Sequence, residues 1–267
     1  MKKLISGVLL AVLFATSPIL MDHAKDVYLQ EVVSPKAMPV KLGQRVVASS
    51  FQLKWRGKRV TVTNNHVCSI MKRREERALK KEITLITARG LLKIMQGTLT
   101  KSESDSIDKK IKELQEQLKK VQSEGVVGKT LRIGDINRKI LYNSPNHDIC
   151  FLEPVDNKSF SLASSVHRGE KITIIGHPRG VPQSMTDGRI VGEAYYTFPW
   201  IQQAGRVRYL RSTAITYPGN SGSPFVNRYG NVVGILFAGR SLNSLNVNCV
   251  VPMEYVESEL MAYFGNK

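Results

Sequence analysis

Three short polar segments of this chain carry the side chains of a charge-assisted nucleophile. They are Thr-Asn-Asn-His, which ends at His66, Asn-His-Asp, which ends at Asp148, and Gly-Asn-Ser-Gly-Ser-Pro, which contains Ser221. A serine hydroxyl attacks poorly until a neighbouring imidazole accepts its proton, and that imidazole needs a carboxylate to fix its tautomer and stabilise its charged form. The three segments therefore predict His66 as a general base, Asp148 as the group that orients it and Ser221 as the nucleophile.

Two of these residues also have simpler interpretations. A single histidine at a strand end is more often a packed or hydrogen-bonded side chain, and the chain has five histidines, so the assignment of His66 depends on its surroundings, Thr63–Val67. An aspartate directly before an apolar run, as Asp148 is, would by itself be interpreted as a turn cap. His147 is expected to be exposed.

Ser221 has the most specific surroundings of the three. Gly219 and Gly222 allow a tight backbone loop, in which the N–H groups of Gly219 and Ser221 could point at a developing oxyanion. Ser223 is the rival hydroxyl, but it lacks a glycine two residues before it. We therefore predict an oxyanion hole formed by Gly219 and Ser221.

Short apolar or alternating runs, separated by turn residues, predict a mainly β fold. Arg56-Gly57-Lys58 separates the first two runs and is typical of a hairpin turn. Many short strands of this kind indicate antiparallel barrels or a sandwich, and the polar stretch 153–170 is the natural boundary between two halves. The predicted strands cover residues 44–54, 59–63, 83–87, 91–96, 130–133, 139–142, 149–152, 171–175, 189–196, 207–213, 224–227, 232–237 and 247–251.

Two helices are predicted among these strands. An apolar stripe at alternating spacings of four and three, with Lys, Glu and Gln between its members, predicts an amphipathic helix at about residues 105–122. The stripe consists of Ile107, Ile111, Leu114, Leu118 and Val121. We favour packing of this inserted helix on the first group of strands, with pairing to another subunit as the alternative. A second helix, Met253–Tyr263, follows the last strand.

The N-terminus does not belong to the predicted β fold. Lys2 and Lys3 precede the apolar run Leu4–Ala15, which has the length of a secretory signal core. The alternative is an uncleaved anchor that extends to Met21, but Pro18 and the marginal length disfavour a spanning helix. We therefore predict that residues 1–24 are a signal peptide or anchor, with the signal favoured, and that the protein is exported to a periplasm or secreted.

The formal charge of the 267-residue chain is +17, from 39 basic and 22 acidic residues. Such a field favours encounters with anionic partners, namely acidic proteins, lipid headgroups, lipopolysaccharide or nucleic acid. A solvated surface that keeps the protein soluble is an equally good explanation, so we predict no specific nucleic acid partner. The oligomeric state is not predicted.

The three cysteines, Cys68, Cys150 and Cys249, allow at most one disulfide and leave an odd thiol. Cys68 and Cys150 follow His66 and Asp148 by two residues each, where the interior of a β fold takes small apolar groups. The interpretation we favour is three buried, unpaired thiols. A metal site would need paired ligands at close spacing, so we predict none.

The three segments resemble the motifs of trypsin-like peptidases of the Deg, or high-temperature-requirement, type. The resemblance rests on Thr63–Val67 and Pro218–Gly222, on the turn Ile174–Gly180, and on the order His, Asp, Ser, which is that of chymotrypsin. It spans roughly residues 46–260. No counterpart of the predicted helix at 105–122 is evident in the family, Ser223 replaces the family's usual glycine, and no sequence after Lys267 is left for a PDZ module.

This resemblance implies two antiparallel six-stranded β-barrels of the chymotrypsin type. Residues 25–155 would form the first lobe, with the inserted helix, and residues 156–267 the second lobe, with the C-terminal helix. The implied activity is that of a serine endopeptidase that forms an acyl-enzyme on protein or peptide substrates and needs no cofactor. The rival hypothesis is a basic binding protein on a protease scaffold whose catalysis is vestigial.

The same resemblance locates a substrate pocket. In this fold the residue six before the nucleophile, here Ile215, tends to lie at the base of the primary pocket, and Phe237, Ala238 and Gly239 would form its wall. Because Ile215 is not acidic, we expect no demand for Arg or Lys, and we predict a preference for aliphatic or small aromatic side chains. Discrimination between such substrates should be modest.

Overall fold

The computed structural model describes residues 27–265 apart from residues 30–32, 34–35, 198–205 and 243–244. The predicted export segment, residues 1–24, lies outside this part of the chain. The described residues form two compact units, one made of the residues up to Val67 and from Gly128 onwards, the other of Cys68–Val127. Within the part of the chain that is described, no helix is both long and apolar enough to span a bilayer.

The first β-barrel is built from strands on both sides of the Cys68–Val127 unit in the sequence. Its strands are β1 (Ala37–Leu42), β2 (Arg45–Trp55), β3 (Lys58–Thr63), β4 (Thr130–Ile133), β5 (Ile136–Ser144) and β6 (Ile149–Leu152). They follow the order β1-β2-β3-β6-β5-β4, and pairing of Val40 with Ile133 closes the barrel. β3 and β6 therefore lie side by side, and the residues that follow β3 and precede β6 meet at one rim.

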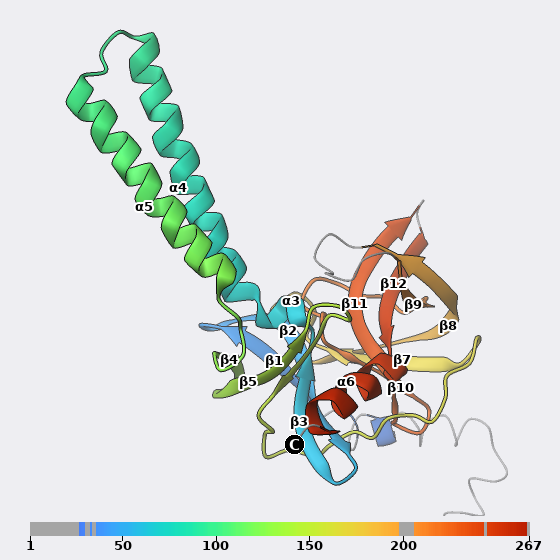
Figure 1. Ribbon diagram of the computed structural model, residues 1–267. Helices are drawn as coiled ribbons and strands as arrows, with labels where there is room; N and C mark the ends of the chain where they lie inside the picture. Colours follow the sequence, from blue (N-terminus) through green and yellow to red (C-terminus); the bar gives the residue numbers. More distant parts are fainter. Residues whose placement is uncertain (1–26, 30–32, 34–35, 198–205, 243–244, 266–267) are drawn as a thin grey trace, which may run out of the picture. The chain divides into compact units, whose positions relative to one another are not determined.

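The second barrel repeats this arrangement in the C-terminal half (Figure 1). Its strands are β7 (Lys171–Gly176), β8 (Ser184–Tyr196), β9 (Val207–Ser212), β10 (Pro224–Asn227), β11 (Val232–Leu242) and β12 (Leu245–Pro252). The order is β10-β11-β12-β9-β8-β7, closed where Phe225 pairs with Ile174. The prediction of a mainly β fold with two antiparallel six-stranded barrels is confirmed.

The two barrels share one continuous apolar core. Phe51 and Phe151 of the first barrel belong to the same buried cluster as Tyr209 and Phe237 of the second, and Phe160, from the connecting segment, lies edge-on to Phe51. Complete burial of such a side chain contributes roughly 1.5–3 kcal/mol. Because this packing crosses from one barrel to the other, the rim between them is held rigidly.

Strand β1 is not among the strands predicted from the sequence. Its residues, Ala-Met-Pro-Val-Lys-Leu, contain Pro39, and a proline disfavours assignment to a sheet because it cannot donate a ladder hydrogen bond. In the structure β1 pairs with β2 and more briefly with β4, and its register shifts between Val40 and Lys41. Tertiary pairing therefore outweighs the local signal.

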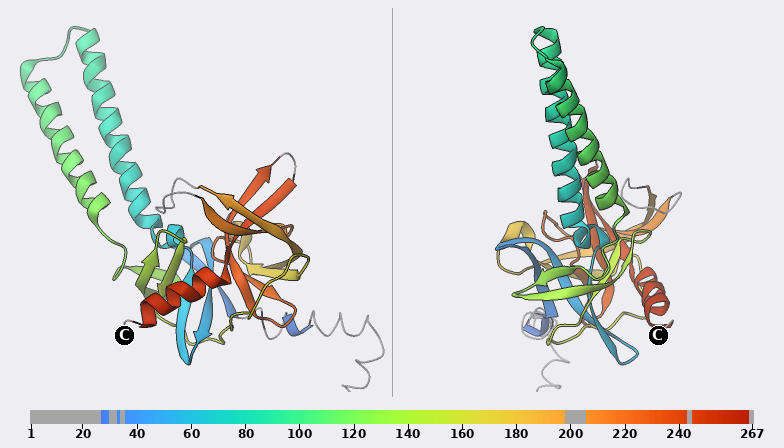
Figure 2. Two further views of the ribbon diagram at one scale, coloured as in Figure 1. Left: turned by 45° about the vertical axis from the view of Figure 1, so that its right-hand side comes forward. Right: turned by 60° about the vertical axis from the view of Figure 1, so that its left-hand side comes forward.

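The Cys68–Val127 unit is an antiparallel helical hairpin of α4 (Ile70–Met95) and α5 (Lys101–Ser123), seen side by side in both views of Figure 2. The predicted strands 83–87 and 91–96 are wrong, because both segments lie within α4. The predicted helix at 105–122 is present as part of α5. Its apolar stripe has α4 as its neighbour within the hairpin, a helix that the sequence analysis had not foreseen.

Local interactions define both ends of the hairpin. At the turn, Thr100 and Glu103 form a capping box at the start of α5, and Lys93 at the end of α4 forms an ion pair of 2.6 Å with Glu103. At the base, Lys72 donates to the carbonyl oxygens of Gln122 and Glu124 at 2.8 and 2.7 Å. The two long helices are thus held together at both ends.

The cysteines differ from the prediction. Cys68 and Cys150 are disulfide-bonded, and Cys249 is a buried thiol. The sequence separation of cysteines carries no information on which of them meet in space. The interpretation of Cys68 and Cys150 as unpaired thiols is therefore wrong.

A polar cluster joins the C-terminal helix α6 (Met253–Gly265) to the first barrel. The buried carboxylate of Glu259 accepts hydrogen bonds from Tyr142 and Ser144 of β5 and contacts Nδ1 of His147, each at 2.5 Å. His147 also stacks on Tyr255, so the prediction that it is exposed is wrong. Burial would raise the pKa of Glu259, but the hydrogen bonds from His147, Ser144 and Tyr142 outweigh burial and hold that pKa below its usual value.

Glu259→Gln should destabilise the protein by about 2 kcal/mol at pH 7, because the ionised carboxylate is worth more to its donors than an amide. The folded-state pKa lies below the ordinary 4.5, so the advantage of the wild type should persist above that pH and vanish as the pH falls further. Urea unfolding at several pH values measures this. Glu254→Gln, at an exposed position of the same helix, is the control. Equal effects of the two variants on stability would contradict the stabilising role of the Glu259 carboxylate.

Candidate active site

The structure brings the predicted base and its orienting acid into direct contact. His66 lies in the short helix α3 (Asn65–Cys68), just past the end of β3, and Asp148 precedes β6. Asp148 Oδ2 lies 2.6 Å from His66 Nδ1, and Asp148 Oδ1 accepts a hydrogen bond of 2.7 Å from the His66 backbone N–H. Because one carboxylate holds both the ring and the backbone, the imidazole is fixed with Nδ1 towards the acid.

Asp148 is held in an unusual backbone conformation. Its φ is 55°, in the left-handed region that aspartate tolerates better than most side chains, and its side chain is 1% exposed. Its carbonyl oxygen accepts hydrogen bonds from Asn65 N at 3.0 Å and from Asn64 Nδ2 at 3.1 Å. The two asparagines that precede His66 therefore position the acid, a role that sequence reasoning did not assign to them.

The second barrel supplies an aromatic wall for this pair. Phe237 of β11 lies edge-on to the His66 ring at 6.1 Å and stacks on Tyr209 of β9 at 5.1 Å. Burial, reinforced by the negative charge of Asp148, raises the pKa of Tyr209 well above its usual value. An apolar wall of this kind strengthens the attraction between carboxylate and imidazole. Tyr209 was not predicted from the sequence.

The loop that contains Ser221 requires its two glycines. Gly219 has a φ of 102° and Gly222 a φ of 84°. A Cβ at Gly219 would lie 2.5 Å from the carbonyl oxygen of His177, and one at Gly222 would lie 2.2 Å from the Ser49 oxygen and 2.3 Å from Thr63 Oγ1. No other residue type fits either position without movement of the backbone.

Ser49 on β2 connects this loop to the first barrel. Its backbone N–H donates to the carbonyl oxygen of Ser221 at 2.8 Å. Its hydroxyl donates to the carbonyl oxygen of Gly219 at 3.0 Å and accepts a hydrogen bond from the backbone N–H of His177 at 2.9 Å. The Ser49 carbonyl oxygen in turn accepts from Thr63 Oγ1 at 2.8 Å. Thr63 ends the strand that leads to His66, so the loop of Ser221 and the base are tied to the same two strands.

The two candidate hydroxyls differ in accessibility. Ser223 is completely buried, and a Cβ at Gly176 would collide with its Oγ, whereas Ser221 is partly exposed. A nucleophile must be reached by its substrate. The surroundings therefore favour Ser221 over Ser223, and the role of Ser221 as nucleophile stays a prediction.

The predicted pocket residues occupy two segments of the second barrel, near the loop of Ser221. Ile215 is half exposed, and its carbonyl oxygen accepts from Thr186 Oγ1 at 2.9 Å. Phe237 is buried beside His66, and the backbones of Ala238 and Gly239 continue β11, paired with Cys249 and Asn248 of β12. The role of these residues in substrate binding stays a prediction.

Asn248 was not anticipated either. Its amide group hydrogen-bonds the Ala214 carbonyl oxygen and the Thr216 hydroxyl, on either side of Ile215. A buried amide that serves two partners fixes its segment more firmly than packing alone. Asn248 therefore positions the segment that leads to Ser221.

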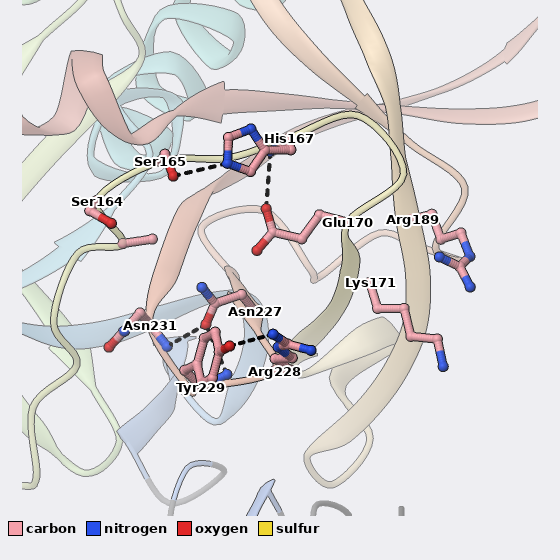
Figure 3. A pocket seen from close by; sticks show the side chains of 11 residues that line it. Ser164, Ser165, His167, Glu170, Lys171, Arg189, Asn227, Arg228, Tyr229 and Asn231 are labelled. Carbon is pink, nitrogen blue, oxygen red and sulfur yellow. Dashed lines mark hydrogen bonds between the residues drawn. The ribbon is translucent and has the colours of Figure 1, made fainter. Parts of the chain in front are cut away.

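A hollow of about 1010 Å³ on the second barrel is separate from these residues (Figure 3). It is bounded by the segment from Ala163 to Lys171, by Arg189 and by the turn Asn227–Asn231, and none of the predicted catalytic residues lines it. Among the described residues, no group of three His, Cys, Asp or Glu side chains is arranged to bind a metal.

Comparison with protein families agrees with this geometry. The family model described as "Trypsin-like peptidase domain" matches residues 48–235, well over half of the chain. The chain belongs to the trypsin-like peptidases. The family resemblance found in the sequence motifs is thereby confirmed, whereas a search of the curated proteins found no match.

Solved structures share the fold of this trypsin-like peptidase at low sequence identity. The active form of the Rv3671c protease from M. tuberculosis matches with a TM-score of 0.58 and 15% identity, over 93% of this chain and 87% of that one. The MamO protease domain from Magnetospirillum magneticum matches at 0.52 and 15%, over 86% and 98%. An HtrA-type protease, a variant of AlgW with a tripeptide, matches at 0.56 and 14%, over 91% and 64%.

Ser49→Ala should lower kcat/KM for peptide hydrolysis about tenfold, because the loss of one hydroxyl leaves Gly219 O and His177 N without a partner and loosens the loop of Ser221. The matched control is Ser50→Ala, which removes a buried hydroxyl that donates to the Met38 carbonyl oxygen. Steady-state kinetics of both variants measure the difference. Equal losses in the two variants would show that Ser49 has no special role.

The buried His177 should make the protein acid-sensitive. Burial lowers its pKa to about 4, so it is neutral in the folded state while the unfolded chain binds a proton near pH 6.5. Stability should therefore fall, by up to about 3 kcal/mol, as the pH drops from 6.5 to 4. Urea unfolding at pH 7 and 4.5 measures this loss of stability. His177→Gln should reduce the difference in unfolding free energy between the two pH values, whereas His167→Gln, at an exposed position, should not. An unchanged difference in His177→Gln would rule the explanation out.

Proposed function

We propose that this trypsin-like peptidase is a serine endopeptidase that uses a Ser-His-Asp triad and an acyl-enzyme. His66 is the general base, Asp148 orients it and Ser221 is the nucleophile. The observation that carries the proposal is the pair of hydrogen bonds that the Asp148 carboxylate accepts from the ring and the backbone N–H of His66. The attachment of the Ser221 loop to β2 through Ser49 supports it.

In the proposed reaction, Ser221 Oγ attacks the carbonyl carbon of the peptide and its proton passes to His66 Nε2. Asp148 stabilises the imidazolium through Nδ1 and stays ionised. The C–N bond then breaks as His66 returns the proton to the leaving amine, which leaves an ester on Ser221. Water, activated by the same imidazole, hydrolyses the ester and restores the enzyme.

The backbone amides of Gly219 and Ser221 are the proposed donors to the oxyanion. Within the described part of the chain neither N–H donates to another protein atom, which supports this role. The left-handed backbone of Gly219 permits the turn that leaves both amides available. Loss of one such donor typically costs about 10²–10³ in rate.

For the substrate we propose proteins or peptides with an aliphatic or small aromatic side chain at the primary position. Ile215, on the segment held by Asn248, offers an apolar surface without an acidic group. A panel of peptides that differ only at this position tests the preference. A higher kcat/KM for Arg or Lys than for Leu would contradict it.

Export remains part of the proposal. Disulfides persist mainly outside the reducing cytosol, so the disulfide-bonded Cys68 and Cys150 support the prediction that residues 1–24 direct export. N-terminal sequencing of the mature protein after expression with its own leader tests whether the segment is removed or retained as an anchor. Recovery of the chain in the cytosol alone would contradict export.

Ser221→Ala and His66→Ala should each lower casein or peptide hydrolysis by at least ~10³-fold without loss of folding. Ser221→Ala should also abolish labelling by a fluorophosphonate, whereas Ser223→Ala should still be labelled. Wild-type turnover in either of the first two variants would overturn the triad. An unlabelled, inactive wild type that elutes from heparin or DNA only at high salt would instead favour the basic binding protein.

A further inference from the structure

The hairpin carries a second, uncovered stripe on α4. Its members follow one another at spacings of three or four residues along one face of the helix, and all are exposed. They are Arg74, Arg77, Lys81, Leu85, Ala88, Leu92 and Met95, which we call the outer stripe. The residues that pack towards α5 form a different face, which includes Leu79, Ile83, Ile86 and the buried Gly90 close to Ile107.

The distal half of the outer stripe is apolar. Leu85, Leu92 and Met95 are exposed, Met95 to 84%, and Leu91, four residues before Met95, adds one further exposed side chain beside them. Single exposed apolar residues are common, but four large ones on one side of the last eleven residues of a helix form a contiguous patch. Such a patch marks a surface that another apolar phase covers.

The proximal half of the same stripe is basic. Arg74, Arg77 and Lys81 occupy it, Lys80 lies beside it, and no acidic residue belongs to it. None of these four takes part in an ion pair within the described residues. The whole Cys68–Val127 unit has 14 basic and 9 acidic residues, a formal charge of +5.

We propose that the outer stripe of α4 binds the surface of an anionic lipid bilayer. The apolar distal turns would enter the boundary between headgroups and acyl chains while the basic proximal turns contact the headgroups. Peripheral helices combine apolar burial with attraction to anionic lipid in this way. Lys81 and Met95 are separated along the helix axis by about 21 Å. A shallow tilt of the helix therefore lets the basic half contact the headgroups while the apolar half reaches the acyl chains.

The charge pattern argues against a second copy of the chain as the occupant. If two outer stripes paired in parallel, Arg74, Arg77 and Lys81 of each copy would face one another, and like charges would repel. If they paired antiparallel, the basic half of each stripe would lie against the apolar half of the other and leave cations on an apolar surface. A bilayer presents anionic and apolar layers together, as the stripe requires.

Co-sedimentation of the full chain with vesicles tests the proposal, with residues 1–24 retained in every variant so that their contribution is constant. We expect the partition coefficient to be at least tenfold higher for phosphatidylcholine with phosphatidylglycerol (1:1) than for phosphatidylcholine alone. L92S/M95S should lower it about tenfold, and R74E/R77E/K81E should remove the preference for the anionic vesicles. The matched control is Ile136→Ser, at an exposed apolar residue of the first barrel, which should change nothing.

A fluorophore reports on the stripe directly and independently of residues 1–24. An environment-sensitive dye attached to Leu92→Cys should shift to the blue with phosphatidylglycerol vesicles, and the same dye at Asp105→Cys, on the exposed side of α5, should not. Circular dichroism confirms the helical content of each variant. Unchanged partition in L92S/M95S would overturn the proposal, as would a dye shift that depends on protein concentration without vesicles, which would indicate self-association.

Discussion

The contacts of Ser49 are the constraint on which the rest of the site depends. The proposed catalytic groups come from two barrels, so the proposed chemistry requires that the loop of Ser221 in one barrel be held in register with His66 of the other. Ser49 meets this requirement with its N–H, its hydroxyl and its carbonyl oxygen, which bind Ser221, Gly219, His177 and Thr63. Gly222 must lack a side chain because this approach is so close.

The second constraint is the placement of a buried negative charge. Asp148 is almost completely enclosed, and the cost of removing its carboxylate from water is offset by two hydrogen bonds from His66 and by the rigid backbone around it. Asn64 and Asn65 hold that backbone through the Asp148 carbonyl oxygen. The short polar segment before His66 therefore positions Asp148 as well as His66.

The sequence allowed the site to be predicted where chemistry restricts the residue type. A base, an acid and a nucleophile between glycines have few substitutes, so His66, Asp148 and Ser221 stand out, and most strands show their alternating or apolar pattern. Ser49 and Tyr209 could not be found, because a buried serine in one strand and a tyrosine in another carry no local signal of what they touch. Their roles arise from pairing between segments far apart in the chain.

Helix α4 shows why two strands were wrongly predicted from the pattern of apolar residues. Its inner face is apolar to contact α5, and the distal part of its outer face is apolar as well, so Ile83–Thr87 and Leu91–Gln96 resemble short β-like runs rather than one amphipathic helix. The stripe of α5 is one-sided and was found. The disulfide bonding of Cys68 and Cys150 was not predicted for the same reason as the role of Ser49, because the spacing of residues in the sequence does not show which of them meet in space.

The bonds of Lys72 at the base of the hairpin have a consequence for how the polypeptide reaches its native topology. His66 and Asp148 are 82 positions apart, a long loop to close by random search. Most of the intervening chain is a helical hairpin whose own contacts are local and form quickly, and Lys72 brings its beginning to its end at Gln122 and Glu124. Once the hairpin has formed, the chain still to be closed between His66 and Asp148 is six positions before Lys72 and 24 positions after Glu124 instead of 82, so the hairpin lowers the entropic cost that this insertion adds to assembly of the barrel.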